Sequence, residues 1–446
     1  MRRLGAGFVS VGVLLVALTV VAGGSARGGV ATPSTPWVDP RCHLERVAPY
    51  NELVAGVHDV AITADGTRAY FRTILDAAGP HDPGYDVFER TIAAGEVREL
   101  TGETGFPPPY DFEVSADGSS MAYAQNVGND IIELRVVDTG TLATTTVVDE
   151  GWVSTGGDGD GGFRLDDAGE RLVYHGWDAP TPGADPVQGV WLYDLTTDEK
   201  TLVDALGSWF GSLAISGDGS LITYVRPTSG EPPEEGEEPT SELVTYEVAT
   251  GDVEPVLVDG EPLPLEHLTQ VVFGAAPDRM LVDLTGWRWS PPGPGEGSVQ
   301  LVDLGAGTAT PLDDAFAATG EIFDLTSDDD LDLVVWSTPR AHTEGGAIYR
   351  RSTAAGSETE VLATGMELQS FDASDDGRRV VFTTDVNLLG ELPNSAGWLT
   401  YLLDCWTFAD VGPDHPFAAD IEWFAEQGIT EGYDDRTFRP AAPVTR

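Results

Sequence analysis

The chain has 446 residues, of which 74 are acidic and 24 are lysine or arginine, and its formal net charge is −50. A surface this acidic repels nucleic acid and anionic lipid headgroups, which excludes both as expected partners. The length allows two or three domains.

The first 26 residues are predicted to be a secretory signal peptide. Arg2 and Arg3 precede an apolar stretch from about Phe8 to Val21, and small residues lead to a cleavage position after Ala26. The alternative is a membrane anchor, but the apolar stretch is short for a span and no other segment approaches about 18 apolar residues. We therefore expect export, no membrane span in the mature chain, and a linker over residues 27–41.

One ten-residue pattern recurs about every 50 residues from Ile62 to Phe382. It joins two apolar strands through a tight turn that usually contains Asp-Gly, because glycine adopts the positive φ that such turns need. Two further strands fit after most copies. The copies are ITADGTRAYF, VSADGSSMAY, LDDAGERLVY, ISGDGSLITY and ASDDGRRVVF, with AAPDRMLVDL and TSDDDLDLVV as degenerate ones. Seven such units predict an all-β fold, a seven-bladed β-propeller of four-stranded blades over residues 42–405.

The copies SADGSSMAY and SGDGSLITY resemble the PD40, or TolB-like, form of the WD40-like β-propeller repeat. This resemblance covers roughly residues 42 to 405. It implies the propeller fold and no particular function, because unrelated activities use the same repeat.

The two cysteines, Cys42 and Cys405, flank the repeats. The last repeat has material for three strands only, and the segment CHLERVAPY before the first repeat matches the missing fourth strand. Cys405 would then end the third strand and Cys42 would begin the fourth beside it, so we expect a disulfide in an oxidising compartment. Two unpaired thiols are the alternative.

The long connections between repeats are expected on one face of the ring, at the mouth of its channel. Long loops on a rigid scaffold carry most binding residues, and aromatic, histidine and acidic side chains around a concave mouth suit a glycan or a peptide. The alternative is that each of these residues only packs between blades or fills a loop. The candidate ligand face comprises His58, His175, His267, Trp209, Trp287 and Trp289.

Catalytic and metal patterns are mostly missing. The sequence has no G-x-S-x-G, no H-E-x-x-H and no cysteine-rich zinc pattern, so we expect no catalytic residues, metal ligands or cofactor. The loop GGDGDGG carries Asp158 and Asp160, whose carboxylates could bind calcium, but it lacks a glutamate at the spacing expected for a bidentate ligand. The alternative is a solvated glycine-rich loop without a bound ion.

The segment FADVGPDHPFAADIEWFAEQGITEGYDDRTFRPAAPVTR, residues 408–446, resembles an S-layer homology (SLH) motif of the actinobacterial type. A helix is expected from about Phe417 to Gln427, with Phe417, Ile421 and Phe424 on its apolar face. The resemblance implies binding to anionic cell-wall polysaccharide, with Trp423 and Arg446 at ligand positions. In the family a second helix follows Arg446, so residues 406–446 are expected to form an incomplete motif that binds weakly by itself.

Together these features predict an exported, non-enzymatic propeller. It would be attached to the cell wall by its SLH region and would bind a glycan or protein at the channel mouth. The alternative is a secreted carbohydrate-active enzyme of the polysaccharide lyase kind. A lyase needs a base and a cation or metal that converge at the mouth.

Overall fold

A computed structural model describes most of the propeller and part of the C-terminal segment, all within one compact unit, Pro33–Arg446. The described residues are 36–47, 59–73, 86–101, 109–128, 131–149, 152–154, 162–180, 184–205, 212–228, 241–263, 265, 270–284, 299–312, 322, 324–338, 346–354, 356–390, 398–408, 410–412, 415–426, 429–430, 433 and 437–440. The predicted signal peptide and most of the long connections lie outside them.

The first four blades follow the chain order, each strand pairing antiparallel with the next. Blade 1 comprises β3 (Val60–Ile62), β4 (Arg68–Thr73), β5 (Asp86–Thr91) and β6 (Val97–Glu99). Blade 2 comprises β7 (Pro109–Val114), β8 (Ser120–Gly128), β9 (Ile131–Asp138) and β10 (Thr144–Val148). Blade 3 comprises β12 (Phe163–Leu165), β13 (Arg171–Asp178), β14 (Val187–Asp194) and β15 (Glu199–Ala205), and β11 (Trp152–Val153) also pairs with β13. Blade 4 comprises β16 (Leu213–Ile215), β17 (Leu221–Pro227), β18 (Ser241–Glu247) and β19 (Val253–Pro255).

Blade 5 also follows the chain order, whereas blades 6 and 7 each include a strand from the N-terminal segment. Blade 5 comprises β22 (Gln270–Phe273), β23 (Arg279–Asp283), β24 (Val299–Asp303) and β25 (Thr308–Pro311). Blade 6 comprises β26 (Asp324–Ser327), β27 (Leu333–Thr338), β28 (Gly346–Ser352) and β29 (Glu360–Met366), with β1 (Trp37–Val38) as a fifth strand. Blade 7 comprises β30 (Leu368–Ala373), β31 (Arg379–Thr384), β32 (Leu399–Cys405) and β2 (Cys42–Arg46). A small hairpin, β20 (Leu257–Val258) and β21 (Glu261–Pro262), lengthens the repeat between blades 4 and 5.

The seven first strands contact one another in a closed ring, β3 to β7, β12, β16, β22, β26, β30 and back to β3. The core lies between neighbouring blades. Trp191 packs among residues of blades 2 and 3, and Trp336 among residues of blades 5 and 6; both side chains are fully buried. The prediction of an all-β, seven-bladed propeller is therefore confirmed.

In six of the blades the repeat's turn is held by hydrogen bonds of its own side chains. In blade 1 the Thr63 hydroxyl donates to Asp65 Oδ1 (2.7 Å) and accepts from the Arg68 amide (3.1 Å), while Asp65 Oδ1 accepts from the Thr67 amide. Gly66 has φ +66°, which other residues rarely adopt. Serine replaces threonine in the equivalent networks of blades 2, 4 and 7. These local bonds explain why the sequence pattern repeats.

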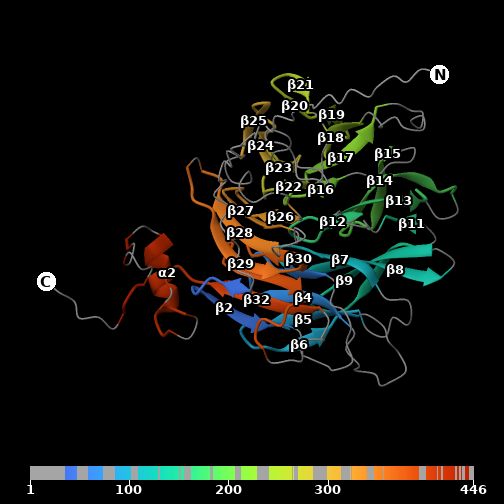
Figure 1. Cartoon of the computed structure of the whole chain (residues 1–446). Coiled ribbons are helices and arrows are strands. Elements are labelled where there is room, and N and C mark those ends of the chain that lie inside the picture. Colours follow the sequence, from blue (N-terminus) through green and yellow to red (C-terminus); the bar gives the residue numbers. More distant parts are fainter. Residues whose placement is uncertain are drawn as a thin grey trace, which may run out of the picture. The chain divides into compact units, whose positions relative to one another are not determined.

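The ring is closed by the two ends of the propeller. β2 pairs with β32, and in this register Cys42 lies opposite Cys405 (Figure 1). The two cysteines form a disulfide, and their Cα atoms are 3.8 Å apart. The fourth strand of blade 7 thus comes from the N-terminal segment, as its sequence predicted.

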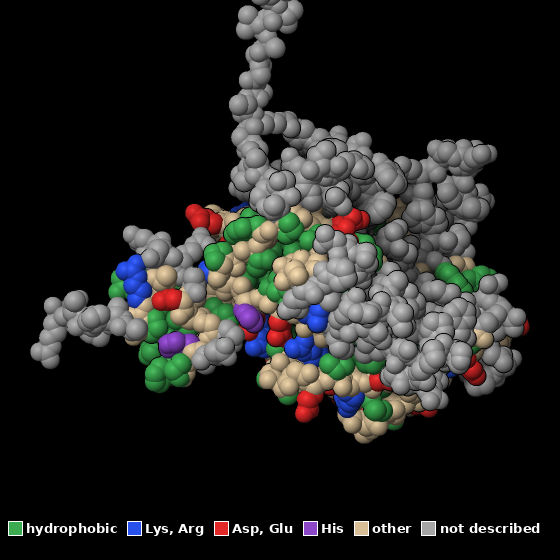
Figure 2. All heavy atoms as spheres, turned by 60° about the horizontal axis from the view of Figure 1, so that its bottom comes forward, with side chains coloured by type: hydrophobic (Ala, Val, Ile, Leu, Met, Phe, Trp, Pro, Cys, Tyr) green, Lys and Arg blue, Asp and Glu red, His purple; other side chains and the backbone are tan. Residues whose placement is uncertain are grey.

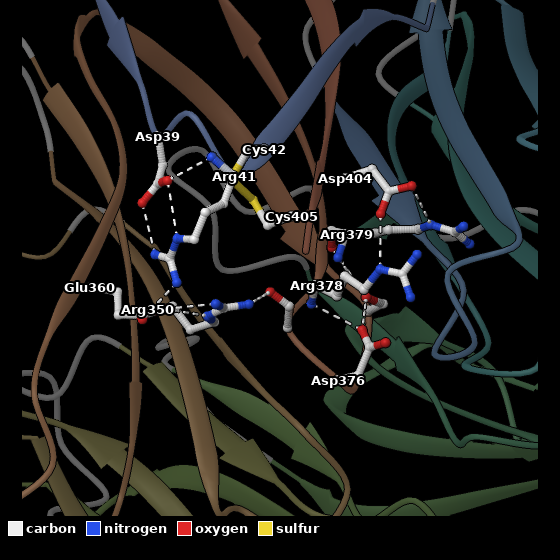
Figure 3. Close-up of a disulfide and its surroundings, with 12 residues drawn as sticks. Asp39, Arg41, Cys42, Arg350, Glu360, Asp376, Arg378, Arg379, Asp404 and Cys405 are labelled. Atoms are coloured by element: carbon white, nitrogen blue, oxygen red, sulfur yellow. Dashed lines mark hydrogen bonds and ion pairs between the residues drawn. A yellow bond between two sulfur atoms is a disulfide. The ribbon is translucent and has the colours of Figure 1, made fainter. Parts of the chain in front are cut away.

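Ion pairs reinforce this closure (Figure 3). The Arg41 guanidinium donates to Asp39 Oδ2 (2.7 Å) and to Glu360 Oε1 (3.1 Å), and Arg350 pairs with the other oxygen of Glu360 (2.6 Å). Because β1 pairs with blade 6 and β2 with blade 7, the N-terminal segment joins two blades. The described part of the predicted linker, residues 36–41, therefore belongs to the propeller.

The C-terminal segment contains one described helix, α2 (Ala418–Glu426), close to the predicted bounds. Its apolar face differs from the prediction. Ile421 is buried together with Ala418, but Phe417 is 62% exposed and Phe424 is 40% exposed. Phe417 precedes the helix, and the buried side is the one that carries Ala418, Ile421 and Ala425. No helix among the described residues is long and apolar enough to cross a membrane.

Candidate functional site

Charged side chains occupy the inner strands of four adjacent blades. We name as the inner-strand cluster the half-buried residues Asp59 and Arg72 of blade 1, Asp111 and Glu113 of blade 2, Arg164 of blade 3 and Asp372 of blade 7. Most of these residues lie on or next to the first strands, which form the central ring, and Arg72 lies on the second strand of blade 1.

Ion pairs and hydrogen bonds join the members of the cluster across blades. Arg72 pairs with Asp59 (2.7 Å), and Arg164 of blade 3 lies 3.8 Å from Glu113 of blade 2. Asp372 of blade 7 accepts a hydrogen bond from the Ile62 amide of blade 1 (2.9 Å). The cluster therefore tethers neighbouring inner strands to one another.

The pKa values of three of these carboxyl groups are raised above the ordinary range. Burial raises the pKa of Asp372 to about 7, although hydrogen bonds from the Ile62 and Ala373 amides oppose the shift. Burial and the charge of Asp59 raise the pKa of Asp111, and burial raises the pKa of Glu113 despite nearby Arg164. Carboxyl groups with a raised pKa can exchange a proton closer to neutral pH than ordinary carboxyl groups, or bind a polar ligand.

His175 is the one member of the predicted ligand face within the described residues. It lies in β13 and is only 1% exposed, so in this structure it is not part of an open surface. Burial, and to a smaller extent Arg164, lowers its pKa to about 3, which keeps the imidazole neutral. The other predicted residues of that face lie outside the described part: His58, His267, Trp209, Trp287 and Trp289.

The described residues contain no group of three histidine, cysteine, aspartate or glutamate side chains placed to hold a metal ion. The calcium-type loop with Asp158 and Asp160 lies outside them.

Sequence reasoning missed the inner-strand cluster. Its signal is a charged residue two or four positions before the residue that opens the turn in these blades. Asp111 and Glu113, for example, stand four and two positions before Ser115. This alternation resembles that of an ordinary half-exposed strand, so it gave no indication that these charged residues gather in one cluster.

On the face drawn in Figure 2, the described acidic and basic side chains lie in small mixed groups. Lys200, the single lysine of the chain, pairs with Asp178 (2.7 Å), and Arg226 pairs with Glu242 (2.6 Å). These two basic residues are thus used in local ion pairs.

The C-terminal segment has a small core of its own. It comprises Trp406, Phe408, Val411, Ala418 and Ile421, with Ala425 and Phe438 against it. Asp410 accepts hydrogen bonds from the Phe438 and Arg439 amides (2.7 and 2.8 Å). These bonds hold the residues after α2 against the start of the segment. Trp406 links this core to blade 7, because the Arg378 guanidinium lies 3.5 Å from its ring centre.

Residues 407–446 match the S-layer homology domain. The motif positions Phe408, Asp410, Val411, Ile421 and Phe438 are those that build or brace the small core, which explains why the pattern is so specific. Trp423 lies within α2, but its side chain is outside the described part, as is Arg446.

Solved structures share the propeller fold. An oligogalacturonate lyase in complex with manganese is 16% identical, with a TM-score of 0.55 over 82% of this chain and 93% of that one. The oligogalacturonate lyase of Vibrio parahaemolyticus is 14% identical, with a TM-score of 0.56 over 83% and 98%. The β-propeller domain of the Trilobed protease from Pyrococcus furiosus, which has an open velcro topology, is 14% identical, with a TM-score of 0.51 over 74% and 91%. At these identities the likeness shows the fold alone, and no curated protein sequence matches the chain.

Proposed function

We propose that this chain is an exported propeller, attached to cell-wall polysaccharide through its SLH region, that binds a glycan or protein at the mouth of its channel without catalysing a reaction. The SLH match on a propeller scaffold indicates association with the cell wall or cell surface. The main support for the proposal is the small core of the C-terminal segment, in which residues of the SLH motif pack together. Trp406 joins this core to blade 7.

Export is supported by the closing disulfide. A bond between Cys42 and Cys405 persists in an oxidising compartment and is rare in the cytosol. The N-terminal sequence, with its charged start, apolar stretch and small residues up to Ala26, is consistent with the same compartment.

Cell fractionation tests export and wall association together. The protein is expected in the wall fraction of the cells that make it, with Arg27 as its first residue after cleavage behind Ala26. A cytoplasmic protein that retains residues 1–26 would contradict the proposal.

A polysaccharide lyase remains the second candidate because the inner-strand cluster offers a base and a cation. Glu113, whose pKa is raised by burial, lies 3.8 Å from Arg164. A lyase could use such a carboxylate to remove a proton and a guanidinium to stabilise the resulting charge.

An activity assay separates the two candidates. The purified protein is incubated with oligogalacturonate, with and without manganese, and unsaturated product is measured. The binding proposal predicts no product. Product that disappears in the variant Glu113→Gln would favour the lyase instead.

A further inference from the structure

Trp177 is an exposed tryptophan near the end of β13 in blade 3. It is 46% exposed, whereas the five residues before it, 172–176, and Asp178 after it are buried. Among the tryptophans whose side chains the structure describes, only Trp37 on β1 of blade 6 is similarly exposed, at 40%. Single exposed apolar side chains are common, so the neighbours of Trp177 decide whether it belongs to a binding site.

Trp177 lies on the side of blade 3 that faces blade 4. Residues alternate between the two faces of a strand, so Trp177 shares a face with Val173. Val173 packs in the core between the two neighbouring blades, together with Val190 of blade 3 and Tyr224 of blade 4 (Figure 1). In the register of blade 3, Gln188 of β14 lies opposite Trp177 and so places its amide on the same face.

Polar side chains of both blades meet at the same junction. The Tyr224 hydroxyl of blade 4 donates to Asp204 Oδ2 of blade 3 (2.9 Å). Arg226 stands two residues after Tyr224 on β17, on the same face, and lies 3.8 Å from Asp204. Its guanidinium also donates to Glu242 Oε1 of β18 (2.6 Å). The side chains of Asp204, Arg226 and Glu242 are 23%, 33% and 23% exposed, so a ligand in solution can reach them.

The indole and the polar side chains lie at the same end of this junction. Trp177 follows the turn glycine Gly169 by eight positions, and Arg226 follows the equivalent Gly219 by seven. A backbone hydrogen bond of 3.0 Å joins the two turns, and the second strands of both blades run away from them in the same direction. The junction therefore ends in an exposed indole on one side and a guanidinium with carboxylates on the other.

This combination of side chains matches the chemistry of a sugar. A pyranose ring has flat C–H faces and a rim of hydroxyl groups, so it needs an aromatic surface beside hydrogen-bond donors and acceptors. Trp177 supplies the surface, while Gln188, Asp204, Arg226 and Glu242 supply the polar groups. Two carboxylates face one guanidinium, and the chain carries a net charge of −50, so an acidic sugar is disfavoured.

We propose that the junction between blades 3 and 4 is a binding site for a neutral oligosaccharide, in which Trp177 stacks on one sugar ring and the polar side chains of Gln188, Asp204, Arg226 and Glu242 bind its hydroxyl groups. This inference rests on the glycan-binding part of the proposed function and names the site and the ligand class. Attachment to the wall through the SLH region is a separate claim.

The test is calorimetric titration of the whole protein with neutral oligosaccharides of glucose, mannose, galactose and xylose, and with oligogalacturonate as the acidic comparison. At least one neutral oligosaccharide should bind, and oligogalacturonate should bind more weakly or not at all. Trp177→Ala should weaken binding of the neutral sugar about tenfold or more, because a truncated aromatic anchor typically causes a loss of this size. Trp177→Phe keeps an aromatic ring and should retain part of the affinity.

Trp37→Ala is the matched control, because it removes the other exposed tryptophan from a different blade. It should bind the sugar like the wild type. Because Trp177 is half exposed, Trp177→Ala should fold and should fractionate with the cell wall as the wild type does. Wild-type protein that fractionates with the wall but binds none of the neutral oligosaccharides would overturn this inference and leave wall attachment standing. Equal affinity of the wild type and Trp177→Ala, or tighter binding of oligogalacturonate, would also overturn it.

Discussion

Reduction of the Cys42–Cys405 disulfide should lower the free energy of unfolding by up to about 5 to 6 kcal/mol, because the bond closes a loop with a sequence separation of 363 residues. This is an upper figure, since residual structure in the unfolded chain reduces it. The folded propeller should still form, because the β2–β32 ladder and the ion pairs of Arg41 remain.

The measurement is urea unfolding with and without a reductant. The reduced protein should unfold at a clearly lower urea concentration. The double variant Cys42→Ser/Cys405→Ser is the control, and its midpoint should not respond to the reductant. Coincident curves for the oxidised and reduced wild-type protein would contradict the account.

Trp406→Ala should release the C-terminal segment from blade 7. Trp406 is 6% exposed, belongs to the core of that segment and lies against Arg378, so its truncation should cost about 3 to 5 kcal/mol. Only the C-terminal segment should lose stability, because the hydrophobic cores between the blades are unchanged.

Hydrogen exchange within α2 and proteolysis between residues 407 and 440 measure this effect. Both should increase strongly in Trp406→Ala, while the melting temperature of the propeller changes little. Phe417→Ala is the matched control, since Phe417 is 62% exposed and surface substitutions usually change stability by less than about 0.5 kcal/mol. Unchanged protection of α2 in Trp406→Ala would show that Trp406 does not hold the segment.

The fold could be predicted from the sequence because its signals are local. Each blade carries its own turn, and in blades 1, 2, 4 and 7 a serine or threonine, an aspartate and a glycine bond to one another within a few residues. The closure was also predictable, because Cys42 and Cys405 mark the two strands that meet. A two-residue strand such as β1 has no pattern, so it was assigned to a linker.

The contacts within the inner-strand cluster could not be predicted because they depend on how the blades pack. Arg164 and Glu113, for example, become neighbours only when blades 2 and 3 pack. For the C-terminal helix, the large side chains of Phe417 and Phe424 were predicted to form the buried face. The helix instead buries the side that carries the smaller Ala418 and Ala425.

The most direct test of wall attachment is fractionation of cells that make either the intact protein or a variant with residues 407–440 deleted. This deletion keeps Cys405 and Trp406, so the propeller and its disulfide stay intact. We expect the intact protein in the wall fraction and the deletion variant in the culture medium. Equal retention of both proteins in the wall fraction would contradict anchoring through the SLH region.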